Sequence, residues 1–151
     1  MIINRKALLL SKPIKDMLET KEHDHGVSYG LSEAGYDIRV KQRLVLTPEN
    51  RFTLASTVEE FDMPDDLVAV VHDKSTHARR GISVFNTVIE PGWKGFLTLE
   101  IVYHGNETLV IDAGTGIAQV LFHKISNRQK YSGKYQNQPD NPVEAIMDGE
   151  G

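Results

Sequence analysis

The sequence predicts an all-β protein, built as a sandwich or barrel, with a short N-terminal helix and a flexible C-terminal tail. Two observations predict this class. Short segments with strand-type alternation or β-forming residues recur from residue 36 to residue 125. Turn-forming residues separate them, as at residues 48–50, 63–66 and 114–116. Short strands at such spacing are typical of β-sandwiches and barrels.

The predicted elements follow in order along the chain. Residues 4–18 are predicted to form the helix, which Pro13 would break or kink. Residues 21–35 are polar and contain glycines, so a loop is predicted there. The β region begins at residues 36–46, where Ile38 and its alternate apolar neighbours define one face and charged residues define the other. The other predicted strands cover residues 51–57, 67–72, 82–89, 96–103, 107–111 and 117–125.

A chain of 151 residues is expected to form one domain. Residues 1–125 hold all the predicted strands. Residues 126–151 are polar, contain Gly and Pro and have few core residues, so they are predicted to be a flexible tail of the same domain. Tyr131, Lys134 and Gln138 give this tail side chains that suit a lid over a ligand.

Composition and charge argue against several classes of function. The formal net charge of −4 disfavours a nucleic-acid-binding module, which usually has a basic excess, but it leaves room for a local pocket that binds a small anion. No apolar run is long enough for a membrane span, and residues 7–10 are too short for a signal peptide. The chain has no cysteine, which removes disulfides, thiol nucleophiles and thiolate zinc sites and fits a reducing compartment such as the cytoplasm.

Polar groups that a strand does not need gather in residues 71–81 and 88–101. Glu100 is the sharpest case, because strand alternation places apolar residues on both faces around it. A carboxylate in such surroundings has a raised pKa unless it is paired, and a raised pKa suits a general base near neutral pH. The alternative is a structural ion pair between Glu100 and Arg79 or Arg80.

Residues 73–79, DKSTHAR, follow a predicted strand and combine two cations, Lys74 and Arg79, with the hydroxyls of Ser75 and Thr76. Cations, hydroxyls and turn amides together form a good cradle for phosphate groups. The alternative is a solvated polar turn. The glycine motifs of P-loop and Rossmann proteins do not occur.

Other polar residues are interpreted first as structural. His23 and His25 are close in sequence, but no third ligand is in register, so a zinc site is not expected. His77 is interpreted as a surface histidine. Gln119 fits a buried amide bonded to the backbone, and Trp93 fits either a core side chain or a stacking surface for a ligand.

Five segments together resemble one known family in their order and spacing. They are residues 34–39 (AGYDIR), 74–81 (KSTHARRG), 89–100 (IEPGWKGFLTLE), 116–119 (GIAQ) and 133–138 (GKYQNQ). In combination they resemble the dCTP deaminase branch of the trimeric dUTPase superfamily. The resemblance implies a distorted β-barrel or jelly-roll that forms a homotrimer with active sites between subunits. It also implies a deoxynucleoside triphosphate as substrate, Mg²⁺ carried by that triphosphate rather than by direct protein ligands, and no zinc.

The resemblance implies a role for each site residue. Glu100 is similar to the family's catalytic glutamate, which passes a proton from a water towards the pyrimidine while that water attacks C4 and ammonia leaves. Ser75 would hold this water, and Arg79 would fix the charge and geometry around it. The substrate-binding residues would be Lys74, Ser75 and Thr76 at the phosphates, Tyr131, Lys134 and Gln138 from the closing tail, and also Glu90 and Gln119.

Some residues depart from the family pattern. Thr76, His77 and Arg80 differ from the usual residues, and Asp73 adds a carboxylate beside the phosphate site. Two alternatives to a deaminase therefore stay open. One is a dUTPase, or a bifunctional enzyme that forms dUMP and pyrophosphate, for which Glu90 would be the acid that activates water. The other is a non-catalytic nucleotide-binding trimer. The expected location is the cytoplasm, or the host cytoplasm for a viral chain.

Overall fold

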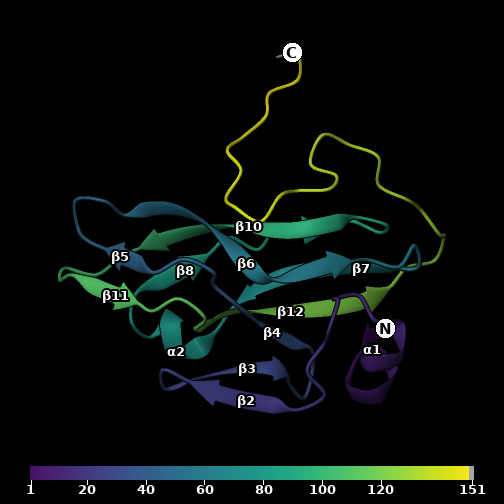
Figure 1. Ribbon diagram of the computed structural model, residues 1–151, viewed down its shortest axis with the longest axis horizontal. Helices are drawn as coiled ribbons and strands as arrows, with labels where there is room; N and C mark the ends of the chain where they lie inside the picture. Colours follow the sequence, from purple (N-terminus) through teal and green to yellow (C-terminus); the bar gives the residue numbers. More distant parts are fainter. Residues whose placement is uncertain (150–151) are drawn as a thin grey trace.

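Strands are the main regular elements of the molecule, which a computed structural model describes for residues 1–149. Figure 1 shows the strands stacked on one another, with the hairpin of β2 and β3 on one side and the C-terminal tail leaving on the opposite side. The all-β class is confirmed. Residues 150 and 151, the end of the predicted tail, lie outside the described residues.

The strands form three sheets. The largest has seven strands in the order β2-β3-β4-β12-β7-β9 with β1 paired to β12, the second has the order β6-β10-β8, and the third pairs β11 with β5. Every pairing between these strands is antiparallel. The bounds are β1 (Ile2–Ile3), β2 (Lys21–Asp24), β3 (Val27–Leu31), β4 (Tyr36–Arg39), β5 (Leu44–Leu46), β6 (Phe52–Asp62), β7 (Leu67–Asp73), β8 (Ile82–Val84), β9 (Val88–Ile89), β10 (Lys94–Tyr103), β11 (Leu109–Ile111) and β12 (Gly116–Lys124), with helices α1 (Arg5–Ser11) and α2 (Ser75–Ala78).

The strand β10 separates the core from the candidate site. Its alternate residues Leu97, Leu99 and Ile101 belong to the hydrophobic core, which also takes side chains from the large sheet. Because successive side chains of a strand point to opposite faces, Thr98 and Glu100 lie on the other face. The strand β6 covers one edge of β10 and places Leu54 opposite Glu100.

The predicted N-terminal helix is confirmed, but it is shorter than expected. It ends at Ser11, and Lys12 adopts the left-handed conformation with φ of 49°. The N–H of Lys12 donates to the carbonyl of Leu8, and Pro13, which has no N–H, follows. The predicted continuation to residue 18 is wrong, because Ile14 forms a bridge to Phe61 of β6 instead. No helix in residues 1–149 is long and apolar enough to cross a membrane.

The predicted loop at residues 21–35 is wrong, because β2 and β3 form a hairpin there. The two turn residues, His25 and Gly26, have φ of 52° and 75°. Positive φ at both central residues belongs to the type I′ turn, whose twist matches that of the strands it joins. All four residues of β2 are exposed. The strand therefore lacks the apolar alternation on which a prediction from sequence depends.

Three other predicted boundaries need correction. The predicted strand at 36–46 is two strands, β4 and β5, and the one at 82–89 is also two, β8 and β9. The strand predicted at 51–57 continues to Asp62 as β6. Its charged continuation is tolerated because the buried carboxylate of Glu59 accepts a 2.8 Å hydrogen bond from Nε of Arg39.

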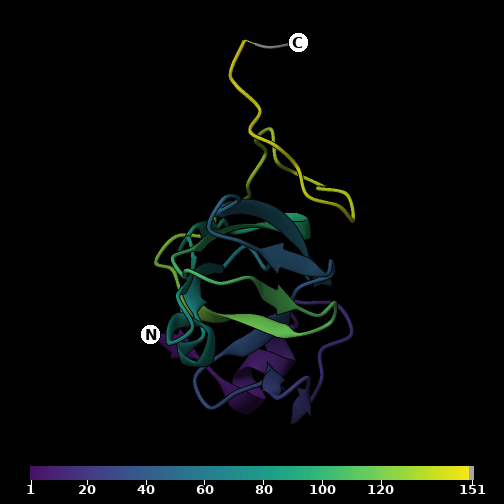
Figure 2. The same cartoon turned by 90° about the vertical axis from the view of Figure 1, so that its left-hand side faces the viewer.

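The tail follows β12 and contains no helix or strand in the part that ends at residue 149. Figures 1 and 2 show it passing beside β10 and then running away from the body of the molecule. A parallel bridge between Gly95 and Gln138 attaches it to β10. The division into residues 1–125 and a flexible tail stays a prediction.

Candidate functional site

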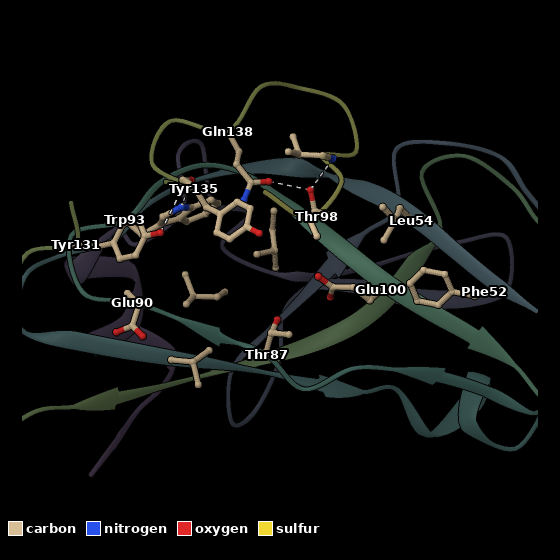
Figure 3. A pocket seen from close by; sticks show the side chains of 15 residues that line it. Phe52, Leu54, Thr87, Glu90, Trp93, Thr98, Glu100, Tyr131, Tyr135 and Gln138 are labelled. Atoms are coloured by element: carbon tan, nitrogen blue, oxygen red, sulfur yellow. Dashed lines mark hydrogen bonds between the residues drawn. The ribbon is translucent and has the colours of Figure 1, made fainter. Parts of the chain in front are cut away.

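A cavity of about 490 Å³ lies between the outer face of β10, residues 87–93 and the tail. Figure 3 shows Glu100 and Thr98 reaching into it from β10, with Tyr135 and Tyr131 of the tail to their left. This size and its largely apolar wall suit a small-molecule site. The lining residues are Phe52, Leu54, Thr87, Val88, Ile89, Glu90, Trp93, Leu97, Thr98, Glu100, Tyr131, Tyr135, Gln138, Val143 and Ala145.

Glu100 is the half-buried acid of this cavity. Burial raises the pKa of its carboxyl group, and a backbone hydrogen bond opposes the shift in part. The alternative of an ion pair with Arg79 or Arg80 is not formed, because no cation pairs with Glu100 anywhere in residues 1–149. An unpaired carboxyl whose pKa is raised towards neutral pH is suited to accept and return a proton.

The tail forms one wall of the cavity through specific hydrogen bonds. Nε1 of Trp93 donates to the carbonyl of Tyr135 at 2.6 Å, and the N–H of Tyr135 donates to Oη of Tyr131 at 3.1 Å. Trp93 is thus both a buried side chain and part of the cavity wall. Of the predicted site residues, Glu90, Glu100, Tyr131 and Gln138 are brought together here.

The DKSTHAR residues lie elsewhere in the same chain. Ser75 and Thr76 are exposed on the single turn of α2, and Arg79 is exposed directly after it. Lys74 is largely buried, and its ammonium lies 2.5 Å from Oδ2 of Asp37. None of these four residues lines the cavity that holds Glu100. Within one chain, the residues of the predicted phosphate site therefore lie outside the cavity of the predicted general base, Glu100.

Gln119 and Lys134 also lie outside the cavity. Nε2 of Gln119 donates to Oγ of Ser32 at 3.0 Å, so this amide bonds to a side chain rather than to the backbone. The ammonium of Lys134 lies 3.0 Å from Asp148 and 5.6 Å from the centre of the Tyr135 ring. It therefore stays within the tail.

Two residues at which the DKSTHAR segment departs from the family pattern, His77 and Asp73, have structural roles. His77 is not a surface residue as predicted: its exposure is 1%, and its Nε2 contacts the carbonyl of Gly116 at 2.7 Å. Burial lowers the pKa of His77, so the ring is neutral near pH 7. Asp73 uses its carboxylate to accept a 2.6 Å hydrogen bond from the N–H of Val84, which ties the end of β7 to β8.

The histidines of β2 and its turn build no metal centre. Nδ1 of His25 lies 3.4 Å from Asp112, a second surface group. Within residues 1–149 no cluster of three or more His, Cys, Asp or Glu side chains is arranged to hold a metal ion.

Comparison with known proteins places the chain in a family. The model of the dCTP deaminase-like family matches residues 36–125. The dCTP deaminase of Campylobacter jejuni strain RM1221 is 38% identical over 89% of this chain and 90% of its own length. The chain belongs to the dCTP deaminase-like family. The dCTP deaminase of Sulfurovum sp. strain NBC37-1 is 40% identical over 74% of this chain and 77% of its own length.

Solved structures share the fold of this dCTP deaminase-like chain. The dCTP deaminase of Agrobacterium tumefaciens has a TM-score of 0.61 at 18% identity, over 80% of this chain and 47% of that one. The dUTPase of phage phi11 of S. aureus has a TM-score of 0.56 at 17% identity, over 80% of this chain and 91% of that one. The dUTPase-like all-β fold is thereby confirmed.

Sequence reasoning missed several residues of the cavity in this dCTP deaminase-like chain. Phe52 and Leu54 come from β6, and Val143 and Ala145 come from the distal tail, which had no distinguishing pattern. Thr98 was detectable, because it lies two residues before Glu100 and a strand places both on one face. Its hydroxyl holds the tail, as described below.

Proposed function

We propose that this chain catalyses the hydrolytic deamination of dCTP to dUTP and ammonia. Membership of the dCTP deaminase-like family supports the reaction. The observation that carries the proposal is Glu100, an unpaired carboxyl with a raised pKa on the wall of a cavity large enough for a small molecule.

Glu100 acts as the proton shuttle in this proposal. Its carboxylate takes a proton from a water as the water oxygen bonds to C4 of the cytosine. This proton passes to N3 of the base. The remaining hydroxyl proton is then transferred through Glu100 to the amino group, the C4–N bond breaks as the C4 carbonyl forms, and ammonia leaves, so that dCTP and water give dUTP and ammonia. A positioned acid–base group supplies roughly 10²–10⁴-fold, and the exclusion of water by the tail contributes further.

The active site is completed by a second copy of the chain in a homotrimer. Ser75 and Arg79 lie outside the Glu100 cavity of their own chain, and both are exposed. Exposed groups on α2 of one copy are free to reach the cavity of another. Ser75 then holds the attacking water, and Arg79 fixes the charge around it.

The nucleotide is held by cations and by the tail. Thr76 and Lys74 serve the phosphates, where Lys74 acts beside Asp37, and Tyr131 and Gln138 close over the nucleotide. Lys134, Glu90 and Gln119 complete the proposed binding residues. Mg²⁺ enters on the triphosphate oxygens, where it neutralises charge, and the described residues offer it no cluster of ligands of their own. A substrate from the nucleotide pool supports a location in the cytoplasm, or in the host cytoplasm for a viral chain.

A second activity is favoured by one observation. Glu90 lines the same cavity as Glu100, so the cavity has two acidic side chains in its wall. Glu90 in the role of water activator would make the enzyme a dUTPase or a bifunctional enzyme that forms dUMP and pyrophosphate.

Product analysis tests both functions. The protein is incubated with dCTP and, separately, with dUTP in the presence of Mg²⁺, and the nucleotides are separated by ion-exchange chromatography. The proposal predicts dUTP and ammonia from dCTP. Formation of dUMP from dCTP would establish the bifunctional enzyme, and inert dCTP with dUMP formed from dUTP would establish a dUTPase. Absence of product from both nucleotides would favour a non-catalytic binding trimer.

A further inference from the structure

Thr98 joins β10 to two separate points of the tail. Its hydroxyl donates to Oε1 of Gln138 at 2.8 Å and accepts the N–H of Val143 at 3.1 Å. A threonine hydroxyl has one proton to donate, so both kinds of hydrogen bond are made by a single oxygen atom. Figure 3 shows the bond from Thr98 to Gln138, with Glu100 below Thr98 in this view.

The backbone cannot hold this part of the tail by itself. Up to Gln138 the tail pairs with β10, since Asn137 N donates to the carbonyl of Lys94 and Phe96 N donates to that of Gln138. Pro139 follows and has no N–H, so the ladder cannot continue through it. Among the described residues, Thr98 is the only side chain of β10 that hydrogen-bonds to the tail.

The attachment has a consequence for Glu100. Thr98 and Glu100 are two residues apart on one face of β10, about 7 Å along the strand. Val143, which Thr98 holds, lines the cavity together with Glu100, and so does Ala145. The hydroxyl therefore fixes the segment that covers the acid and keeps water from it.

We propose that Thr98 is the positioning residue that fastens the tail over the active site. This inference rests on the proposed deaminase activity for its kinetic consequence, but not for the attachment itself. Thr98 is not a catalytic residue in this scheme, because it acts through Gln138 and Val143. Loss of the hydroxyl should release the tail around Val143 while β10 and Glu100 stay in place. The neighbouring residues keep their own contacts, from Lys41 to Asp140 and from the N–H of Ile146 to Oη of Tyr135.

Amide hydrogen exchange of the free protein tests the attachment without any substrate. Thr98→Val keeps the branched shape and removes the hydroxyl, and it should reduce the protection of the Val143 amide about tenfold. Thr98→Ser keeps the hydroxyl and should preserve the protection. Thr108→Val, in an exposed loop, is the control for a threonine-to-valine change. Wild-type exchange at Val143 in Thr98→Val would overturn the proposal, whatever the enzyme does with dCTP.

Kinetics then tests the consequence. For Thr98→Val we expect about a tenfold loss in kcat/KM, and an acid limb of the pH profile that moves to lower pH as Glu100 becomes more hydrated. Thr98→Ser should restore both. A merely structural role would lower the amount of folded enzyme without moving the pH profile, and an unmoved profile would overturn the link to Glu100. Should Thr98→Val fail to fold, Val143→Pro removes the N–H that the hydroxyl accepts without changing β10. An acid limb that stays at the wild-type pH in Val143→Pro would then count against the attachment.

Discussion

The buried pair of Lys74 and Asp37 offers a quantitative test of how α2 is held. The side chains of Lys74 and Asp37 are 10% and 6% exposed, and Nζ of Lys74 lies 2.5 Å from one carboxylate oxygen and 3.2 Å from Oγ of Ser28. The other carboxylate oxygen has no hydrogen-bond partner within the described residues. Lys74→Met keeps the aliphatic length and leaves the Asp37 charge buried without its cation. Removing one partner of a buried pair costs about 3–5 kcal/mol of unfolding free energy.

Urea denaturation of the wild type and the variant measures this loss directly. Both proteins are compared at one concentration, because the stability of an oligomer depends on concentration. The matched control is Lys124→Met, since Lys124 pairs with Asp66 at 2.7 Å with side-chain exposures of 46% and 24%. An exposed pair contributes at most about 1 kcal/mol. Equal losses in Lys74→Met and Lys124→Met would refute the claim that burial makes the first pair strong. A further Asp37→Leu change should recover much of the loss, because no buried charge then remains.

The remaining predictions concern the shared active site and two titrating groups. Glu100→Gln and Arg79→Ala chains should each be inactive alone, but a refolded mixture of the two should regain about a quarter of the wild-type activity. In random trimers about a quarter of the sites combine an intact Glu100 from one copy with an intact Arg79 from another. No recovery would contradict active sites between copies. The rate should rise with pH through a pKa above about 4.3, because ionised Glu100 is the base and burial raises its pKa; a limb at the ordinary value would assign the base elsewhere. Because the pKa of Glu100 is raised in the folded protein, the wild type loses stability as pH rises through that pKa and the buried carboxyl ionises. In urea unfolding, Glu100→Gln should therefore be more stable than the wild type at pH 7 and should have no advantage below about pH 4. Burial lowers the pKa of His77, so the unfolded chain takes up a proton at a higher pH than the folded protein does, and stability should fall as pH drops below about 6.5. His77→Gln should remove that part of the pH dependence. An unchanged pH dependence would mean that His77 is not the titrating group.

Strand alternation was sufficient to predict the β-rich body and the position of Glu100. On β10 the core residues Leu99 and Ile101 alternate with the site residues Thr98 and Glu100, as a period of two predicts, whereas Leu97 belongs to the core and also lines the cavity. It failed for β2, where all side chains are exposed and the hairpin depends on the backbone conformation of His25 and Gly26. It also ended β6 too early, because the charge of Glu59 is compensated by Arg39, a partner from another strand.

The composition of the site could be predicted in part, but its assembly could not. The resemblance to a family predicts that Glu100, Ser75 and Arg79 belong to one active site. In the single chain, only Glu100 of these three residues lines the cavity. The partner of Lys74 is Asp37, which is distant in sequence and was expected on the charged face of its strand. Burial of His77 depends on how α2 packs against β12, and no local pattern reports that contact. Tertiary contacts decide each of these cases.

Ammonia release from dCTP by the wild type and by Glu100→Gln tests the central claim most directly. Both proteins are assayed with Mg²⁺ at equal concentration, after their folding and oligomer mass are shown to be the same. The account predicts that Glu100→Gln loses at least about 10²-fold in kcat, because the amide cannot carry the proton from water to the base. Ammonia release at the wild-type rate would remove Glu100 from the reaction and contradict the account.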